Sequence, residues 1–586
     1  MSIPYTDSRR LTGPNLYFTS TGAALETAIA EPVGDALLQR WQHNVRALRQ
    51  ALHWPQADVV LRRHASGVSL AFAAPPDQLY AAVAGNEWAW CDALDLPVAS
   101  DVPALDGVSD RAQALQVLQQ LAAKEARPAA VALLQAAQAH GLPCLLDEDA
   151  LSIGSGIGAR IWPVAALPSL DAVPWADLHA IPTALVTGSN GKTTTVRLIA
   201  AMARAAGLVT AHSCTDGIYI DNMLAEGGDY SGPGGARAVL REPQTQAAVL
   251  ETARGGLLRR GVEVTGAQAA VITNLSEDHF GEYGIHDLDG LAEAKLLVRH
   301  ALSDAGWLVL NADDARLRRA GVASQRRVAW FALDAAAIPS DGVATCHVRD
   351  GHLLLRHAGV LHDLGAVAAM PLTLDGHARY NIANLAAAAL AATAMGIPAQ
   401  AIANTCTTFG TAPEDNEGRM HRCQLGGVEV VIDYANNADG LQQLLQAADT
   451  ARGKGRLAVM LGHAGNRADA DYRALARIAV DNGADLCLLR RRDDYLRGRE
   501  PGAVAGVIAD ELQRLTGDAQ RWRIDADEVE SVRAALAWAR SGDLLLLVVH
   551  SHDARLQAIA LLRRLQRDGW IPGQPLPPRE NAIAHD

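Results

Sequence analysis

The chain has 586 residues, of which 49% are hydrophobic and 20% are charged, and its formal net charge at pH 7 is −13. This length exceeds what one hydrophobic core usually serves, so we expect about three domains. The negative charge argues against general nucleic-acid binding, and the apolar runs are too short to span a membrane or to form a signal peptide. Seven scattered cysteines without a CxxC pair favour reduced thiols. The sequence therefore predicts a cytoplasmic protein without nucleic-acid or membrane partners.

The first part of the chain mixes helix and strand patterns. Residues 37–52 repeat apolar side chains at the spacing of an amphipathic helix, and residues 68–73 have the pattern of an alternating strand. The alanine- and leucine-rich residues 111–139 are typical of helix, and the glycine- and proline-bearing residues 153–174 are interpreted as a connector. We predict an α+β domain over residues 1–165, with no recognisable catalytic motif.

From residue 181 onwards, apolar strand-length runs alternate with helical patterns. Each run ends in a polar residue, and the alternation predicts a parallel sheet with reactive groups at the carboxyl ends of its strands. Residues 330–371 are richer in strand formers and are expected to form an insertion or an edge layer. The predicted central domain covers residues 166–413. Its predicted strands are residues 183–187, 247–251, 269–273 and 307–311.

The same alternation resumes in a third predicted domain, residues 414–586. Its apolar runs are again separated by helical patterns, which predicts a second parallel, Rossmann-like sheet. The proline-rich tail from residue 573 is expected to lie outside this domain's core. The predicted strands are residues 428–433, 457–461, 486–489 and 544–549.

Residues 186–198 read VTGSNGKTTTVRL and lie between a predicted strand and a predicted helix. A glycine-rich turn at this place directs backbone N–H groups and the positive end of the helix dipole at an anion. Lys192 can reach the β- and γ-phosphates of a nucleotide, and the Thr193 hydroxyl can bind Mg²⁺. Val186 stands where the usual phosphate-loop spacing has its first glycine. The predicted phosphate cradle consists of Gly188, Asn190, Gly191, Lys192, Thr193 and Thr194.

Three further polar residues follow in order behind this loop: Glu251, His279 and Lys295. A carboxylate and an imidazole bind Mg²⁺ directly, whereas a lysine does so only after its amine has become a carbamate. Taken singly, each has an ordinary explanation: a capping partner, a turn histidine and a solvated helix residue. Their common position behind a phosphate loop favours a metal site.

These motifs resemble the Mur ligase superfamily of ATP-dependent amide ligases, in which TGxNGKT is the usual form of the phosphate loop. The segments SCTDGIYIDN, VLETARGGLLRRG, VITNLSEDHFG, ARYNIANLAAAAL and VVIDYANNADGLQQLL are similar to the ligase portion of the cyanophycin synthetases. The resemblance covers residues 181–550, and LTGPNLYF is similar to the first domain of that family. There an ATP-grasp domain separates the two parts, but here LSIGSGIGARIWP ends shortly before residue 181. One of two ligase centres is therefore expected to be missing.

The resemblance implies a role for each matching residue. Lys192 would bind the β- and γ-phosphates and Thr193 a first Mg²⁺, while Glu251 and His279 would bind a second Mg²⁺ beside a carbamylated Lys295. The remaining implied contacts are Asn381 and Asn384 to adenine, Arg419 to phosphate and Asp433 to ribose. The family's DYAHNP motif reads DYANNA here, so that Asn436, which cannot become cationic, replaces a histidine.

The resemblance implies an ATP- and Mg²⁺-dependent ligase that activates a carboxylate as an acyl phosphate and joins it to an amino acid or another amine. An aspartyl, peptide-like acceptor is expected, and both a separate ATP-grasp ligase that makes it and a homo-oligomer are compatible with the sequence. Two alternatives stay open: a non-catalytic ATP-binding partner of such a ligase, and a kinase or NTPase. Candidate substrate contacts are Arg237 and Arg254 for the acceptor and Asp471, Asp494, Arg497 and Arg499 for the amine, although the latter group is equally typical of a solvated loop.

Overall fold

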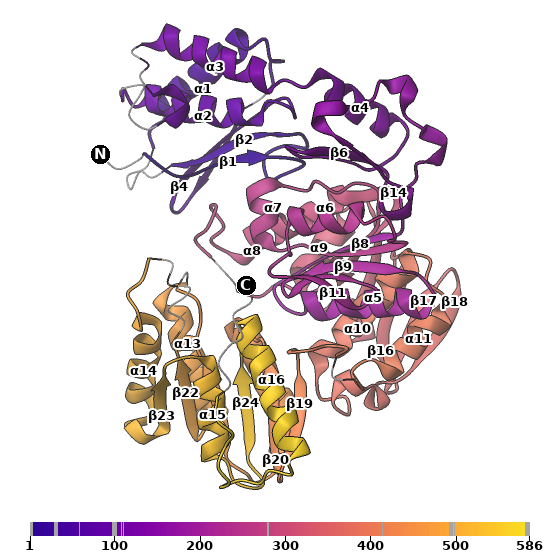
Figure 1. Cartoon of the computed structure of the whole chain (residues 1–586), viewed down its shortest axis with the longest axis vertical. Coiled ribbons are helices and arrows are strands. Elements are labelled where there is room, and N and C mark those ends of the chain that lie inside the picture. Colours follow the sequence, from indigo (N-terminus) through magenta and orange to yellow (C-terminus); the bar gives the residue numbers. More distant parts are fainter. Residues whose placement is uncertain are drawn as a thin grey trace. The chain divides into compact units, whose positions relative to one another are not determined.

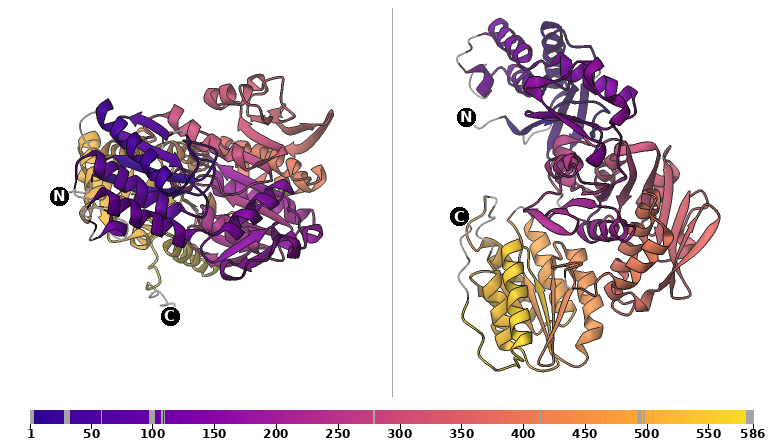
Figure 2. Two further views of the ribbon diagram at one scale, coloured as in Figure 1. Left: turned by 90° about the horizontal axis from the view of Figure 1, so that it is seen from above. Right: turned by 45° about the vertical axis from the view of Figure 1, so that its right-hand side comes forward.

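The computed structural model describes residues 4–27, 33–57, 59–96, 102–106, 108, 110–277, 280–412, 414–465, 467–491, 496 and 498–579 (Figures 1 and 2). It divides into two compact units. The first comprises residues 1–364 and 383–405, and the second comprises residues 365–382 and 406–586. The first unit contains sheets of four, three and eleven strands, the second contains one sheet of six strands, and each unit has hydrophobic cores of its own.

The first unit begins with a four-stranded antiparallel sheet in the order β1-β2-β4-β3, covered on one face by three helices (Figure 1). The predicted helix over residues 37–52 and the predicted strand over residues 68–73 are confirmed. The predicted helical stretch 111–139 forms two helices, because Pro128 is suited to begin a second one. The elements are β1 (Tyr5–Leu11), β2 (Gly22–Thr27), α1 (Asp35–Ala51), β3 (Val59–His64), β4 (Gly67–Ala73), α2 (Leu79–Ala93), α3 (Arg111–Glu125) and α4 (Pro128–Ala139).

Strand β4 is buried on both faces. Leu70 and Phe72 pack into the core formed with the helices, while Ala71 packs on the opposite face with Leu11 and Ala24. The alternation of small and large apolar residues therefore reflects two different apolar layers rather than one core face and one solvent face.

A small three-stranded sheet connects this part to the central sheet. It contains β5 (Cys144–Leu146), β6 (Ala150–Ile153) and β7 (Arg160–Pro163). The predicted connector thus carries a strand of its own. Between β7 and the next strand lie only short 3₁₀ turns, a stretch far too short for a second catalytic domain.

The central sheet has eleven strands in the order β11-β10-β9-β12-β8-β13-β14-β15-β16-β17-β18. Its strands from β9 to β16 in this order run parallel, which confirms the predicted parallel sheet, and the strands of residues 330–371 extend one edge. Figure 1 shows α6 and α7 on one side of β8 and β9, and α5 on the other. The strands are β8 (Thr183–Thr187), β9 (Thr210–Cys214), β10 (Gly217–Ile220), β11 (Met223–Gly227), β12 (Ala247–Glu251), β13 (Ala267–Ile272), β14 (Leu302–Asn311), β15 (Arg327–Ala332), β16 (Ala344–Arg349), β17 (His352–His357) and β18 (Val360–Ala366). The helices are α5 (Lys192–Ala205), α6 (Pro233–Arg241), α7 (Arg254–Arg260), α8 (Leu288–Leu296), α9 (Ala315–Val322), α10 (Arg379–Ala394) and α11 (Ala399–Thr408).

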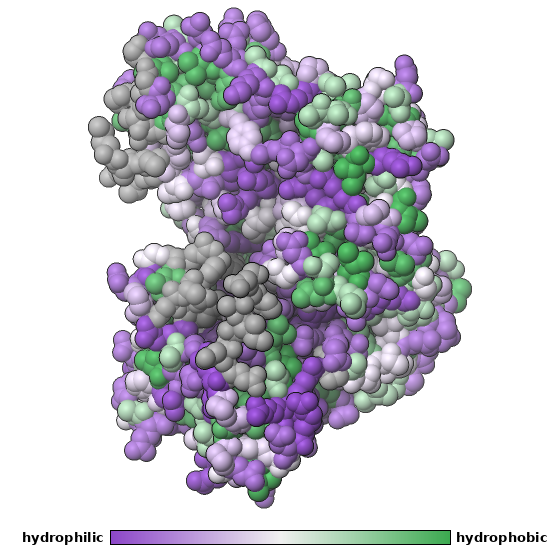
Figure 3. Space-filling model, in the orientation of Figure 1, coloured by the Kyte–Doolittle hydropathy of each residue, from purple (hydrophilic) through white to green (hydrophobic). Residues whose placement is uncertain are grey.

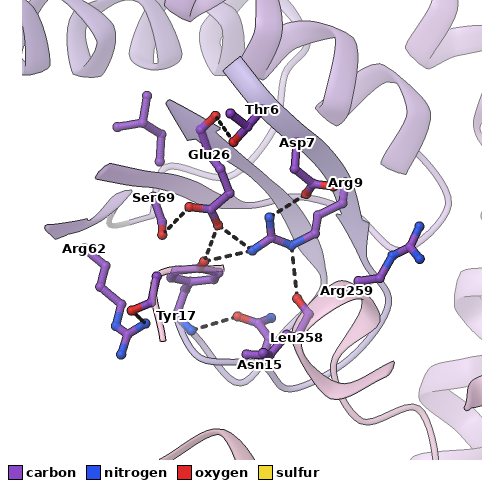
Figure 4. A network of polar contacts seen from close by, with 12 residues as sticks. Thr6, Asp7, Arg9, Asn15, Tyr17, Glu26, Arg62, Ser69, Leu258 and Arg259 are labelled. Carbon is purple, nitrogen blue, oxygen red and sulfur yellow. Dashed lines mark hydrogen bonds and ion pairs between the residues drawn. The ribbon is translucent and has the colours of Figure 1, made fainter. Parts of the chain in front are cut away.

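A buried polar network joins the amino-terminal sheet to α7 (Figure 4). Arg9 donates from Nη2 to Glu26 Oε1 at 2.7 Å and from Nε to the carbonyl oxygen of Leu258 at 3.0 Å. Ser69 Oγ donates to Glu26 Oε2 at 2.8 Å. Arg9 and Glu26 are 4% and 5% exposed, so the two buried charges stabilise each other, and Arg9 Nη1 also pairs with Asp7 Oδ2 at 2.7 Å. The network anchors α7, which begins shortly after Glu251.

The second unit contains a six-stranded sheet in the order β19-β20-β24-β21-β22-β23, parallel except for β19, with a hydrophobic core on each face. The predicted Rossmann-like sheet is confirmed. Its strands are β19 (His421–Leu425), β20 (Val428–Asp433), β21 (Leu457–Leu461), β22 (Leu486–Arg490), β23 (Trp522–Asp525) and β24 (Leu544–Val548). Its helices are α12 (Ala438–Arg452), α13 (Asp469–Asp481), α14 (Ala503–Thr516), α15 (Glu528–Trp538) and α16 (His552–Arg567).

Within the described ranges, every helix is too short or too polar to cross a bilayer. The face seen in Figure 3 is largely hydrophilic, with hydrophobic side chains in separate groups. All seven cysteines carry free thiols.

Candidate active site

The phosphate loop turns sharply between β8 and α5, and two glycines make the turn possible. Gly188 and Gly191 have φ angles of 147° and 79°, which residues with a side chain rarely adopt. A Cβ atom on Gly188 would lie 1.8 Å from Thr273 Oγ1, and one on Gly191 would lie 2.2 Å from Asn384 Oδ1. Val186, in contrast, is a buried residue of β8, where no glycine is required. The valine at the first glycine position is therefore compatible with the loop.

The polar segment that follows β13 holds the loop in place. Asn190 N donates to Asn274 Oδ1 at 2.9 Å, and Thr273 Oγ1 donates to the Asn190 carbonyl oxygen at 2.6 Å. Ser189 Oγ donates to the Ser276 carbonyl oxygen at 3.0 Å, and Ser276 N donates back to Ser189 Oγ at 3.0 Å. Sequence reasoning missed this role, although the run TNLS directly after a buried strand is a visible signal.

Lys192 and Thr193 are the first two residues of helix α5. Lys192 Nζ donates to the carbonyl oxygens of Gly188 and Ser189, both at 3.2 Å, so the ammonium group lies over the loop. Thr194 follows within the buried first turn of the helix. Backbone N–H groups at a helix start and a lysine ammonium group are groups that can bind an anion.

Thr193 and Glu251 are brought together by the pairing of β8 with β12, in which Glu251 lies opposite Val186. Thr193 Oγ1 donates to Glu251 Oε2 at 2.8 Å, and Glu251 is 2% exposed. Because the threonine hydroxyl donates its hydrogen bond to the carboxylate, the lone pairs of its oxygen remain available for a cation. The register of the β8–β12 pair thus brings together two residues that lie far apart in the sequence.

The donors fit Mg²⁺ by their chemistry. Hydroxyl and carboxylate oxygens are the hard ligands that Mg²⁺ prefers, and it usually takes few from the protein and keeps water and phosphate oxygens. Among the described residues, no three His, Cys, Asp or Glu side chains group to hold a metal by themselves. His279 lies outside the described residues. Lys295, in α8, is 2% exposed, so its interpretation as a solvated helix lysine is wrong.

The two predicted adenine contacts differ in their surroundings. Asn381 is 1% exposed and donates from Nδ2 to the Leu372 carbonyl oxygen at 3.0 Å. Asn384 is 3% exposed and lies against Gly191, so it contacts the phosphate loop itself.

In the second unit, Arg419 and Asp433 lie near each other. Asp433 accepts from the backbone N–H groups of Met420 at 2.6 Å and Ala435 at 2.8 Å. Burial raises the pKa of Asp433, and the positive charge of Arg419 offsets part of this shift. The Arg419 guanidinium lies 4.3 Å from the centre of the Tyr434 ring. Arg419 and Met420 also line a cavity of about 430 Å³.

The DYANNA loop is held through its backbone. The Asn436 carbonyl oxygen accepts from His463 Nε2 at 2.7 Å and from Arg467 Nη2 at 2.9 Å. Asn437 caps α12, because its Oδ1 accepts from Gly440 N at 2.7 Å. Ala435 has a φ angle of 22°, which is unusual for a residue with a side chain. His463, from the loop after β21, thus lies beside Asn436, the position at which the related DYAHNP motif has a histidine.

The candidate substrate contacts are mostly engaged in ion pairs. Arg237 pairs with Glu263 and with Asp147, and Arg254 pairs with Glu282. Arg499 Nη1 pairs with Asp469 Oδ1 at 2.8 Å, and Asp471 is an exposed residue in the first turn of α13. Asp494 and Arg497 lie outside the described residues.

Two family models match the chain: the Mur ligase middle domain over residues 186–392, and the Mur ligase glutamate ligase domain over residues 418–548. Cyanophycin synthetase of a Nostoc species is 32% identical over 387 residues, which make up 65% of this chain and 42% of that protein. The chain spans less than half the length of the cyanophycin synthetases that it matches. The UDP-N-acetylmuramoyl-L-alanyl-D-glutamate–2,6-diaminopimelate ligase of Xanthomonas oryzae is 31% identical over 467 residues, 78% of this chain and 87% of that enzyme.

Among solved structures, E. coli FolC in complex with ADP overlaps with a TM-score of 0.48 and 16% identity, covering 66% of this chain and 90% of FolC. A UDP-N-acetylmuramoyl-L-alanyl-D-glutamate–2,6-diaminopimelate ligase overlaps with a TM-score of 0.40 and 21% identity, covering 66% and 78%. These overlaps add nothing to the sequence matches. The matching relatives are named as ligases, and the predicted family and fold class are confirmed. The chain belongs to the Mur ligase family.

Proposed function

We propose that this protein is an ATP-dependent carboxylate–amine ligase. It transfers the γ-phosphoryl group of ATP to a substrate carboxylate, and an amino acid or another amine then attacks the acyl phosphate and displaces phosphate. The products are an amide, ADP and phosphate. The observation that carries the proposal is the hydrogen bond of 2.8 Å between Thr193 and Glu251 behind a phosphate loop, in a chain of a ligase family.

The first task of the site is to bring two anions together. The N–H groups of the loop and the start of α5 bind the β- and γ-phosphates, and Lys192 neutralises part of their charge. The clamp formed by Thr273, Asn274 and Ser276 keeps the loop rigid, so little reorganisation is needed when ATP binds. Positioning and charge neutralisation, rather than covalent chemistry, are the protein's contribution.

Thr193 and Glu251 would hold Mg²⁺ through oxygen atoms, together with His279 and a carbamylated Lys295. Bound there, Mg²⁺ would neutralise the negative charge that builds up between the γ-phosphate and the incoming carboxylate. The burial of Lys295 supports its role, because a lysine removed from solvent needs a specific reason to be there.

The roles that the resemblance implies for four further residues stay part of the proposal: Arg419 binds phosphate, Asp433 binds ribose, and Asn381 and Asn384 contact adenine. The stacking of Arg419 on Tyr434 limits the rotamers of its long side chain and so pre-organises the guanidinium for phosphate.

The proposed acceptor is an aspartyl, peptide-like carboxylate, as the similarity to the cyanophycin synthetases suggests. A separate ATP-grasp ligase would make this acceptor, because the chain passes from β7 to β8 with no room for such a domain. The proposal also places the protein in the cytoplasm and includes a homo-oligomer as its assembly.

A phosphate-release assay that pairs candidate amines with aspartate-containing acceptors tests the proposal, with mass spectrometry of the products. We expect phosphate only when both substrates are present, and an amide of matching mass. The Lys192→Ala variant should lose this turnover. Phosphate release without the amine would indicate an NTPase, and ATP binding without turnover would indicate a non-catalytic partner. If Lys192→Ala matches the parent protein, the phosphate-loop assignment is wrong.

A further inference from the structure

The Glu251 carboxylate has a second threonine partner, which comes from a different strand. Thr215 follows directly after β9, the neighbour of β12 on the side away from β8. Its Oγ1 donates to Glu251 Oε1 at 2.8 Å, and its backbone N donates to Glu251 Oε2 at 3.3 Å. With Thr193 on Oε2, contacts from the described residues use three of the roughly four acceptor positions of the carboxylate, and they leave one open on Oε1.

A buried ion pair fixes the turn that carries Thr215. Arg197, on the phosphate-loop helix α5, pairs through Nη2 with Asp216 Oδ2 at 2.9 Å, and their side chains are 8% and 2% exposed. The Asp216 carbonyl oxygen also accepts from Gly228 N at 3.4 Å, which closes the base of the hairpin β10–β11. Thr215 is therefore tied to the same helix that begins with Lys192 and Thr193.

These contacts define what Thr215 can do. A carboxylate at the end of a strand rotates about its side-chain bonds unless its oxygens are held, and a cation site needs one fixed orientation. Thr215 hydrogen-bonds both carboxylate oxygens of Glu251, and Thr193 hydrogen-bonds Oε2. We propose that Thr215 is a positioning residue for the metal site: it holds the Glu251 carboxylate so that the open position on Oε1 faces the cation. This inference rests on the proposed function, since it assumes a divalent cation at Glu251.

The test uses the full-length protein, with Mn²⁺ as the probe for Mg²⁺ because Mn²⁺ also accepts oxygen ligands. Mn²⁺ binding is measured by electron paramagnetic resonance at a saturating concentration of ADP. The Thr215→Val variant keeps the shape and the backbone N–H of threonine but loses the hydroxyl. We expect it to bind Mn²⁺ about 10- to 100-fold more weakly, the usual effect of removing a partner that orients a metal ligand. The Thr215→Ser variant restores the hydroxyl and should bind nearly as well as the parent protein.

Thr210→Val is a matched control, because Thr210 is a fully buried threonine at the other end of β9 whose hydroxyl bonds the Leu208 carbonyl oxygen. It should leave Mn²⁺ affinity unchanged. Circular dichroism without metal checks that each variant is folded, and Thr215→Ala replaces Thr215→Val if the latter is not.

The inference is overturned if a folded Thr215→Val or Thr215→Ala variant binds Mn²⁺ as tightly as the parent protein, or if Thr215→Ser fails to restore binding. It is also overturned if the parent protein with ADP binds no Mn²⁺. The test measures metal binding and not ligase activity, so the two proposals can fail separately. If the protein binds Mn²⁺ through Glu251 and Thr215 but joins no substrates, only the proposed function is refuted.

Discussion

His212 should make the first unit sensitive to mild acid. It lies on β9, is 2% exposed, and stacks on Tyr219 with ring centres 4.8 Å apart. Neither of its ring nitrogens has a hydrogen-bond partner among the described residues. Burial, together with the positive charges of Arg197 and Arg204, lowers the pKa of His212 to about 3. The folded protein therefore keeps this histidine neutral.

The direction of the pH effect follows from these two states. An unfolded chain takes up a proton on His212 as the pH falls below about 6.5, whereas the folded chain does not until about pH 3. The stability contributed by neutral His212 is thus present above pH 7 and is lost as the pH falls through this window. Between pH 7 and pH 5 the loss from this residue alone is about 2 kcal/mol, from 1.36 kcal/mol for each pH unit below 6.5.

The free energy of unfolding is measured in urea at pH 7 and pH 5. Hydrogen exchange of peptides from β9 and β12 serves as the probe, so that the loss is measured in the unit that contains His212. The matched variant is His212→Phe, which keeps an aromatic ring against Tyr219 but cannot be protonated. We expect about 2 kcal/mol less dependence on pH in the variant than in the parent protein. If both lose the same stability between pH 7 and pH 5, the argument from buried neutral His212 is refuted.

Three further substitutions test the loop, the amino-terminal network and the second unit. Gly191→Ala should abolish ADP binding in calorimetry, because its Cβ would overlap Asn384 Oδ1 at 2.2 Å; retained affinity would mean that the loop is adaptable. Arg9→Met should destabilise the first unit by about 3–5 kcal/mol in urea unfolding, because it leaves the buried Glu26 carboxylate without its arginine partner. Arg9→Met combined with Glu26→Leu should recover most of that loss. A double variant no more stable than Arg9→Met would contradict this account. Arg419→Lys keeps the charge but loses the planar stacking and should lower kcat at least tenfold, so an unchanged kcat would exclude a guanidinium-specific role.

Four central strands of each parallel sheet could be predicted from sequence, because a continuous apolar run is stable only where both faces of the strand are covered. Strands β9 and β23, which read TAHSC and WRID, carry polar residues and were not predicted. The helix over residues 111–139 shows the limit of periodicity alone. Pro128 fits either a kink within one helix or the start of a second, and packing around α3 and α4 decides for two helices. Strand β4 shows a related limit: its alternation predicts a strand, but not the second apolar layer that Ala71 forms with Leu11 and Ala24.

The order of residues along the chain was enough to predict a phosphate loop, because its glycine turn, Lys192 and Thr193 lie within a few residues of one another. The partners of that loop could not be found in this way. Glu251 meets Thr193 and Thr215 only because β12 pairs with β8 on one side and β9 on the other, and Ser276 reaches Ser189 only because β13 lies next to β8. Local chemistry is written in adjacent residues, whereas contacts between residues far apart in the chain depend on strand order and register, which the packing of the whole sheet determines.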